Sequence, residues 1–314
     1  VVMSNTTTYP GNLDLVGYNY QEYRYQEDHQ NYPSRIIYGS ENGKTIATWI
    51  AVDTSKNIFG QYIWTGIDFM GEARAWPVRS SGAGIMDLAG FPKTDYYVRQ
   101  TLWSNKPVIY LTASKVTEGQ QQRGQRLTKP SWNWTKGDKI RINCITNTQE
   151  AELFLNGKSL GKKTRPDSVG ANLSWNIDYE PGELSVKGFT AGKATSAFRL
   201  KSSDSAAAFL TIVDKQKFTP RKKDMAHVEI RIVDKNGNFV YESSNEVTIT
   251  IEGPAKLLGL ENGDLSSHED YKSNKRKVLN GKLMAYVQST GKPGTVKIKV
   301  RSEGLKGKEI VIGN

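Results

Sequence analysis

The sequence predicts a multidomain chain in which an α/β unit is followed by two all-β modules. Between residues 13 and 106, short apolar runs alternate with segments of helical length, which is the pattern of parallel β/α units. After Pro107 the helical period disappears, and Asn-Gly turns separate short strand-like runs. The chain has 314 residues, whereas a single core stops growing at about 250 to 300 residues. We therefore place domains at 1–107, 108–203 and 204–314.

The first domain has almost continuously apolar strands that end in Asn, Tyr, Glu, Trp and Asp. Such strands are typical of a parallel sheet that is buried on both faces, with its chemistry gathered at the carboxyl ends of the strands. We expect strands at residues 13–20, 35–41 and 58–68 and helices at 44–53 and 94–103.

The two later domains have the rhythm of β-sandwiches. Residues 152–160 are a clear hairpin signal around Asn156-Gly157, and strands at 184–189 and 197–200 continue that module. Residues 202–208 are predicted to be a linker. In the last module we expect strands at 209–213, 225–233, 239–241, 246–251, 282–288 and 294–300.

The net charge of +11 arises after residue 110, because residues 1–110 hold 9 basic and 10 acidic side chains. Lys272, Lys275, Arg276 and Lys277 form the densest basic run. A strand, an Asn-Gly turn and a second strand follow it, with no aromatic platform for bases, so we interpret the run as a solvated face and expect no nucleic-acid partner. No apolar run approaches the roughly 18 to 20 residues of a membrane span, and we expect no signal peptide in this sequence.

Motifs for metals and cofactors are missing from the sequence. Cys144 is the single cysteine, and the three histidines are scattered along the chain without metal-ligand spacing. Residues 234–238 are similar to the start of a calcium loop, but the Gly is misplaced and the twelfth position holds no Glu, so we expect a hairpin turn. The sequence contains no nucleophile elbow and no phosphate-binding glycine loop, and we expect neither cofactor nor metal.

Glu41 is the candidate for chemistry, since it follows an apolar strand beside Gly39 and Asn42. Asn19, Tyr20, Trp64 and Asp68 occupy corresponding positions on neighbouring strands. Carbohydrate sites combine an aromatic platform with amide and carboxylate partners for sugar hydroxyls. The alternatives are structural: Glu41 as an ordinary strand-end residue, Trp64 and Tyr20 as packing aromatics, and Asp68 as the cap of a backbone turn.

Several motifs resemble the end of the barrel in family 2 glycoside hydrolases, β-galactosidases of the Bacteroidetes type. They are LVGYNY at 15–20, YPSR at 32–35, GSE at 39–41, FGQYIWTGIDFMGE at 59–72, GIMD at 84–87 and GFPK at 90–93. ELFLNGKSLG at 152–161 and GLENGD at 259–264 resemble the β-modules that follow this barrel. The resemblance implies strands five to eight of a (β/α)8 TIM barrel, with residues 1–5 as the remnant of strand five, and then two immunoglobulin-like β-sandwiches.

The same resemblance implies roles for the site residues. Glu41 matches the catalytic nucleophile, Tyr20 the tyrosine that contacts it, Asn19 its neighbour, and Trp64 the aromatic floor beneath the cleaved sugar. A retaining hydrolase also needs an acid/base about 5 to 5.5 Å from the nucleophile. In the family this residue lies in an Asn-Glu pair. The only such pair here, at 245–246, lies in the last module, so we expect the acid/base outside this chain and little activity from the chain alone.

The expected substrate is a terminal β-galactoside of an oligo- or polysaccharide. β-Glucuronidases of the family usually carry an Asn-x-Lys pair where this chain has Asp87-Leu88-Ala89, which lacks the cation a uronate requires. A β-glucuronidase or β-mannosidase, a non-catalytic carbohydrate-binding or scaffold protein, and a module that binds acidic glycans through its basic sandwiches remain as alternatives. The resemblance implies a periplasmic or secreted protein of carbohydrate metabolism, and the open barrel predicts self-association.

Overall fold

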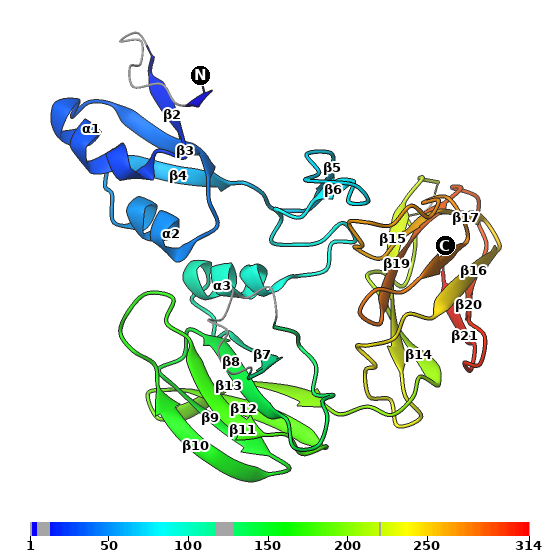
Figure 1. Ribbon diagram of the computed structural model, residues 1–314. Coiled ribbons are helices and arrows are strands. Elements are labelled where there is room, and N and C mark those ends of the chain that lie inside the picture. Colours follow the sequence, from blue (N-terminus) through cyan, green and yellow to red (C-terminus); the bar gives the residue numbers. More distant parts are fainter. Residues whose placement is uncertain (1, 5–12, 117–127, 220, 314) are drawn as a thin grey trace.

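The computed structural model describes residues 2–4, 13–116, 128–219 and 221–313, which form a parallel α/β unit and two β-sandwiches (Figure 1). The prediction of two sandwich modules after an α/β unit is therefore confirmed in outline. Each unit has its own cluster of buried apolar side chains.

The α/β unit is a four-stranded sheet in the order β1-β2-β3-β4, and all its pairings are parallel. A short helical segment and a helix connect β2 to β3, and a second helix connects β3 to β4. The elements are β1 (Val2–Ser4), β2 (Leu15–Asn19), η1 (Glu22–Arg24), α1 (Tyr25–Asn31), β3 (Ile36–Asn42), α2 (Ile46–Asp53) and β4 (Ile58–Ile63). The strand expected at residues 58–68 is wrong in length, because β4 ends at Ile63.

The helices cover one face of this sheet. Val16 of β2, Ile37 of β3 and Ile58 of β4 pack with Tyr25 of α1 and Val52 of α2 in one buried cluster. The other face carries large apolar side chains that remain exposed, namely Leu15, Ile36, Phe59 and Tyr62. Strands of a parallel sheet are normally buried on both faces, so within the described part of the chain this face lacks the cover that such residues usually have.

The second unit is a β-sandwich of two sheets in the orders β10-β9-β12-β13 and β11-β8-β7. Its strands are β7 (Ile109–Lys115), β8 (Lys139–Thr146), β9 (Glu150–Leu155), β10 (Lys158–Thr164), β11 (Leu173–Asp178), β12 (Glu183–Thr190) and β13 (Lys193–Lys201). The predicted hairpin is confirmed: Asn156 and Gly157 both have positive φ, as a tight turn between β9 and β10 requires. Inward side chains of both sheets share one core around Trp132.

The third unit is a second β-sandwich, with the sheet orders β14-β15-β19-β17 and β18-β16-β20-β21. Its strands are β14 (Ala208–Val213), β15 (Met225–Val233), β16 (Glu246–Glu252), β17 (Ala255–Glu261), β18 (Lys275–Lys277), β19 (Lys282–Ser289), β20 (Val296–Arg301) and β21 (Lys308–Ile312). Asp234 accepts hydrogen bonds from the backbone N–H groups of Asn236 and Asn238, which confirms the expected turn. The interpretation of residues 272–277 as a solvated face is wrong for Arg276, whose side chain is fully buried.

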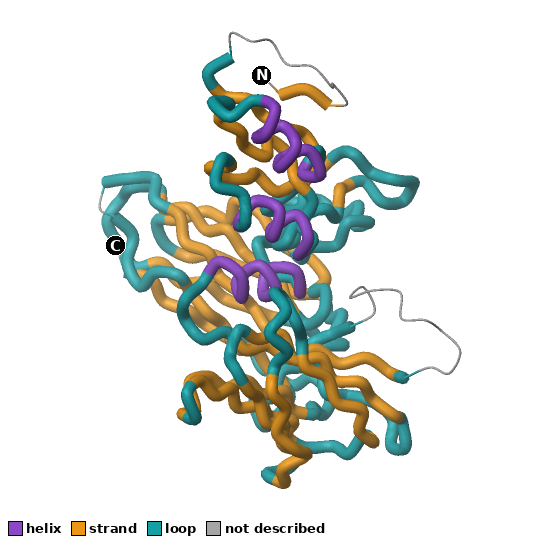
Figure 2. The backbone as a smooth tube through the Cα atoms, turned by 90° about the vertical axis from the view of Figure 1, so that its left-hand side faces the viewer, coloured by secondary structure: helices purple, strands orange, loops and turns teal. Residues whose placement is uncertain are grey.

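Two further elements connect the units. α3 (Thr94–Trp103) packs on the first sandwich, where the rings of Tyr97 and Tyr110 stack with centroids 3.6 Å apart. Buried Arg99 of α3 donates to the carbonyl oxygens of Gly43 and Thr45 at 3.0 and 3.2 Å and thereby holds the start of α2. In Figure 2 the three α-helices follow one another along one side of the molecule. The small hairpin of β5 (Phe69–Met70) and β6 (Ser80–Ser81) lies between β4 and the third unit (Figure 1).

Candidate functional site

Glu41 lies near the carboxyl end of β3, where the pairing with β2 contains an irregularity. The register shifts between Tyr18 and Asn19, so that Asn19 pairs with Glu41. The Asn19 side-chain amide then donates a hydrogen bond to Glu41 Oε2 at 2.9 Å, and the Tyr20 N–H donates to the Glu41 carbonyl at 2.8 Å. The end of two parallel strands thus brings together three of the five predicted site residues.

Tyr20 follows β2 with a φ of 51°, an uncommon conformation for a residue with a side chain, and its ring is partly exposed. Burial raises the pKa of its phenol, and the negative charges of Glu41, Glu22 and Glu72 raise that pKa further. Each carboxylate disfavours a phenolate beside it. Tyr20 therefore keeps its proton near neutral pH and can donate it in a hydrogen bond.

Asn42, the residue after Glu41, connects the end of β3 to its neighbours. Its side chain is fully buried and donates to the Glu22 carboxylate and to the Tyr25 hydroxyl, the latter at 3.2 Å. Its carbonyl accepts the Trp64 N–H at 2.8 Å. Gly39 makes room for it, because a Cβ at position 39 would lie 1.6 Å from Asn42 Oδ1. No sequence pattern distinguishes Asn42, Glu22 or Glu72, and the one local signal is that Asn42 is adjacent to Glu41.

Trp64 directly follows β4, and its backbone bond to Asn42 places it beside the Glu41 segment. The indole packs edge-on against Phe69 with ring centroids 5.5 Å apart, and the Trp64-Thr65 peptide bond is cis. The ring is only partly buried. Trp64 is thus held at the same edge of the sheet as Asn19, Tyr20 and Glu41.

Asp68 is placed differently from the other four residues. It is buried, and its Oδ1 accepts hydrogen bonds from the Gly84 N–H and from Lys93 Nζ, both at 2.8 Å. The Lys93 ammonium also donates to the Gly82 carbonyl at 3.0 Å. These contacts are those of a carboxylate that ties the segment after β4 to residues 82–93, and the structure pairs Asp68 with Lys93 and not with Glu41.

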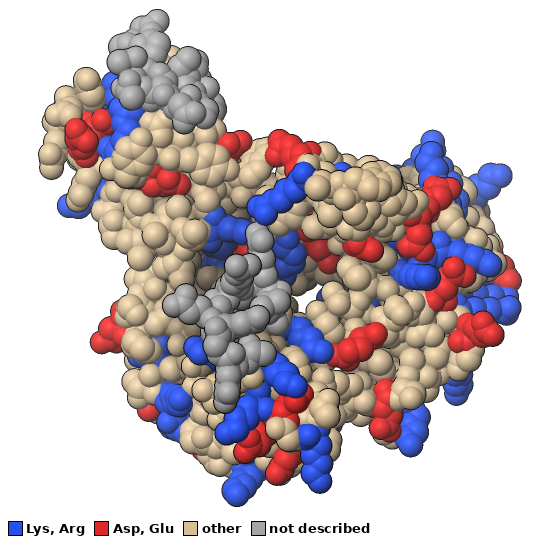
Figure 3. Space-filling view, viewed as in Figure 1, with Lys and Arg blue, Asp and Glu red and all other residues tan. Residues whose placement is uncertain are grey.

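The charges nearest to Tyr20 at this edge are acidic, namely those of Glu22, Glu41 and Glu72. A hollow of about 400 Å³ lies along β4, lined by Trp49, Gln61 and Trp103, and does not include Glu41. Among the described residues, no three His, Cys, Asp or Glu side chains come together as metal ligands. No helix within the described ranges is long and apolar enough to cross a membrane. Figure 3 shows basic and acidic side chains interspersed over the two sandwiches on the face it presents.

Two family models match the chain. Residues 211–311 match the glycoside hydrolase family 2 C-terminal domain 5, and residues 137–196 match a domain of unknown function, DUF4982. Both matches fall in the β-modules. The matched segments correspond to most of the third unit and to the part of the second unit from β8 to the start of β13.

Curated relatives match a larger part of the chain. β-Galactosidase BoGH2A of Bacteroides ovatus is 37% identical over 252 residues, which are 79% of this chain and 28% of that protein. A putative β-glucuronidase of Formosa agariphila is 28% identical over 244 residues, which are 74% of this chain and 22% of that protein. The chain therefore spans less than a third of the length of these relatives.

Solved structures share the fold over nearly the whole chain. A glycosyl hydrolase family 2 member from Bacteroides cellulosilyticus is 27% identical, with a TM-score of 0.85 over 95% of this chain and 42% of that one. A β-glycosidase from Bacteroides vulgatus is 22% identical, with a TM-score of 0.82 over 97% of this chain and 46% of that one. The arrangement of the α/β unit and the two sandwiches is thus the one found in these structures.

Proposed function

Because the chain belongs to glycoside hydrolase family 2, we propose that it is part of a retaining β-galactosidase whose nucleophile is Glu41. One observation carries the proposal: Glu41 stands at the end of a parallel strand, oriented by the Asn19 amide, with Tyr20 on its backbone. An amide donor on Oε2 fixes the rotation of the carboxylate, and a fixed carboxylate is what nucleophilic attack at one face of a sugar requires.

In this mechanism the Glu41 carboxylate attacks the anomeric carbon, and the bond to the leaving oxygen breaks as an acid protonates that oxygen. Water, deprotonated by the same acid/base, then displaces Glu41, so the β configuration is retained. Tyr20 keeps its proton and acts as a hydrogen-bond donor beside the carboxylate. Trp64 offers an aromatic face to the C–H side of the cleaved sugar. Asp68 accepts hydrogen bonds from Lys93 and the Gly84 N–H through its Oδ1, so it differs from the other four residues in holding the segment after β4 in place.

We assign the acid/base to a carboxylate outside this chain. The support is the uncovered face of the parallel sheet, where Ile36, Phe59 and Tyr62 are exposed. Strands β1 to β4 fit as strands five to eight of a (β/α)8 barrel, in which further strands would cover that face. The sandwiches fit as immunoglobulin-like modules of the domains at 108–203 and 204–314. On the same family basis we propose a periplasmic or secreted protein, and we expect isolated chains to associate through the uncovered face.

The proposed substrate is a terminal β-galactoside. The relative that is 37% identical is named a β-galactosidase. The chain also has Asp87-Leu88-Ala89 where β-glucuronidases of the family usually carry an Asn-x-Lys pair, so it lacks at that place the cation that a uronate requires. A β-glucuronidase is the second candidate, because the relative from Formosa agariphila is named a putative β-glucuronidase.

The decisive experiment uses a substrate and a nucleophile that react without help from an acid/base. A dinitrophenyl β-galactoside has a leaving group that needs no protonation, and azide is a nucleophile that needs no deprotonation. We expect azide to accelerate release of dinitrophenolate and to yield β-galactosyl azide, the retained product of two displacements. Glu41→Gln should abolish this reaction, while the control Glu27→Gln, an exposed carboxylate of α1, should leave it unchanged.

Each outcome of this experiment decides a point. Release that persists in Glu41→Gln, or an α-configured azide, would contradict the assignment of the nucleophile. A reaction with the corresponding β-glucuronide but not with the galactoside would keep the mechanism and select the second substrate. Turnover of an unactivated aryl β-galactoside without azide would show that an acid/base is present after all.

A further inference from the structure

Trp76 lies on the segment between β5 and β6 and exposes 81% of its surface. One neighbour backs its ring: His268 of the third unit, with ring centroids 4.5 Å apart and an angle of 40° between the rings. The His268 Nε2 atom lies 3.0 Å from the Pro77 carbonyl oxygen. A large aromatic side chain is therefore presented to solvent on a support that belongs to a different module.

The same two segments are joined at further points. The Arg79 N–H donates to the Leu265 carbonyl at 3.0 Å, and the Leu265 side chain packs so closely on Gly82 that a Cβ there would lie 2.8 Å from it. Arg79 also lies over the Tyr271 ring, with its guanidinium carbon 5.1 Å from the centroid. The hairpin that carries Trp76 is thus clamped by residues 265–271 of the last sandwich.

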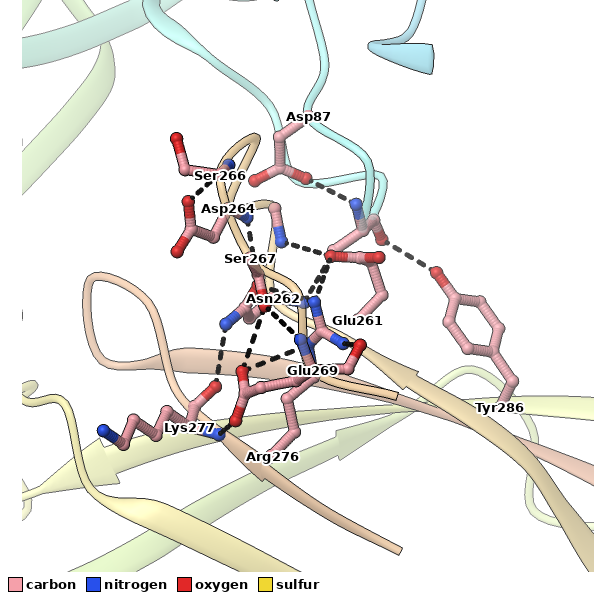
Figure 4. A network of polar contacts seen from close by, with 12 residues as sticks. Asp87, Glu261, Asn262, Asp264, Ser266, Ser267, Glu269, Arg276, Lys277 and Tyr286 are labelled. Carbon is pink, nitrogen blue, oxygen red and sulfur yellow. Dashed lines mark hydrogen bonds and ion pairs between the residues drawn. The ribbon is translucent and has the colours of Figure 1, made fainter. Parts of the chain in front are cut away.

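The clamping loop is held by its own internal bonds (Figure 4). Glu261 Oε1 accepts the backbone N–H groups of Asn262 and Gly263, both at 2.8 Å. Asp264 Oδ1 accepts the Ser266 N–H at 2.9 Å. Buried Arg276 lies beneath the loop and pairs with Glu261 at 3.6 Å. A loop fixed in this way loses little conformational entropy when a ligand binds to what it supports.

The other end of the hairpin faces the candidate catalytic residues. Phe69, the first residue of β5, packs against Trp64. Glu72 is near enough to Tyr20 for its charge to raise the pKa of that phenol. The residues from 69 to 76 therefore lead from the Glu41 edge of the sheet to the exposed indole.

We propose that Trp76, backed by His268, forms an outer subsite that binds a neutral β-linked oligosaccharide beyond the sugar cleaved at Glu41. The proposal rests on the proposed function for the identity of its ligand. An exposed indole that rests against the His268 ring offers a flat apolar surface to the C–H face of a pyranose. The exposed side chains of Glu72 and Arg74 on the same segment supply partners for sugar hydroxyls. The last sandwich then contributes to substrate recognition through His268, 227 residues after Glu41.

The test follows the seven tryptophan indole N–H signals of the ¹⁵N-labelled chain by NMR while sugars are added. The Trp76 signal is assigned from Trp76→Phe. We expect β-1,4-galactotetraose to shift the Trp76 signal and galactose to leave it in place. Trp76→Ala should weaken tetraose binding roughly tenfold, the scale of one lost aromatic contact. His268→Ala should weaken it a few-fold and broaden the Trp76 signal, while Trp103→Phe, a half-exposed tryptophan on α3, should bind as the parent does.

The outcomes separate this inference from the proposed function. No shift of the Trp76 signal with the tetraose overturns the outer subsite, even when Glu41 still reacts in the azide experiment. A Trp76 shift that survives in Glu41→Gln supports the subsite, and it does so even when the azide reaction fails. Equal weakening by Trp76→Ala and Trp103→Phe would show a general change in the fold and would also overturn it.

Discussion

Gly39 and Gly60 lie in adjacent strands of the parallel sheet, and the structure predicts opposite effects when each is replaced by alanine. A Cβ at Gly39 would lie 1.6 Å from Asn42 Oδ1 and 2.9 Å from the Tyr25 hydroxyl, whereas a Cβ at Gly60 would meet nothing within 4 Å. Neither glycine has positive φ, so backbone strain does not separate the two variants. The difference in stability between the two variants therefore reports the cost of crowding the Asn42 side chain.

The magnitude follows from what Gly39→Ala displaces. Overpacking a tight site costs about 1–3 kcal/mol, and a buried polar group that loses its partner costs a further 1–3 kcal/mol or so. We expect a loss of about 2–6 kcal/mol for Gly39→Ala. Gly60→Ala should change the free energy of unfolding little, or raise it by about 0.4–1 kcal/mol, because alanine restricts the unfolded chain.

Hydrogen exchange read by mass spectrometry is the suitable assay, because it reports on the peptides of β3 and β4 separately from the sandwiches. Gly39→Ala should lower protection in β3 at least tenfold, since about 1.4 kcal/mol corresponds to a factor of ten. It should also slow the azide-dependent reaction, because Asn42 and Glu41 are neighbours on one strand. Equal protection of the β3 peptides in the two variants would refute the conclusion that Asn42 requires a glycine at position 39.

Three further predictions concern the other units and the open sheet. Arg276→Ala should lower the free energy of unfolding of the last sandwich by about 3–5 kcal/mol in urea, because it leaves Glu261 buried without its cation. The control Lys277→Ala, at an exposed neighbour, should change it by less than about 1 kcal/mol. Similar losses in the two variants would contradict the role of the buried ion pair. Burial raises the pKa of Asp87 from its ordinary 3.8 to about 6, so the folded state binds this proton more tightly. Its contribution to stability is full below about pH 4 and is lost as pH rises through 6, by about 3 kcal/mol, and Asp87→Asn should remove this pH dependence from the unfolding midpoint. In size-exclusion chromatography with light-scattering detection, the 35.0 kDa chain should elute as an oligomer. Tyr62→Lys should shift it towards the monomer, because it places a charge on the uncovered face of the sheet. A parent chain that is already monomeric would contradict the role of this face.

Strong local signals in the sequence predicted much of the fold. The helix expected at 94–103 and the strand expected at 225–233 have the observed bounds, and the Asn156-Gly157 turn lies where the sequence indicates. α1 was missed because its residues form no apolar stripe: only Tyr25 and Asp28 are buried, and Asp28 is buried through ion pairs with Arg24 and Arg35. Periodicity cannot detect a helix whose inner face is polar.

The candidate site could also be predicted in part from local signals in the sequence. Asn19, Tyr20 and Glu41 were expected at one edge because the carboxyl ends of parallel strands meet there, and the structure brings these three residues together. Asp68 follows the same rule in sequence, but β4 ends five residues earlier, and the chain then turns towards Lys93. Where a strand ends depends on contacts such as the bond from the Trp64 N–H to the Asn42 carbonyl, which no local pattern encodes.

Arg276 shows how a tertiary contact reverses an interpretation drawn from composition. Within a run of four basic residues its side chain has no feature that separates it from Lys275 or Lys277, yet it alone is buried. The difference comes from strand alternation in β18, which turns every second side chain inward, and from Glu261, which approaches from β17. A charge can be buried here only because its partner carboxylate is already fixed by two backbone N–H groups. The arginine and the loop it supports therefore stabilise each other, and Arg276 also donates a hydrogen bond to the carbonyl of Glu269, the residue that follows His268, at 3.4 Å.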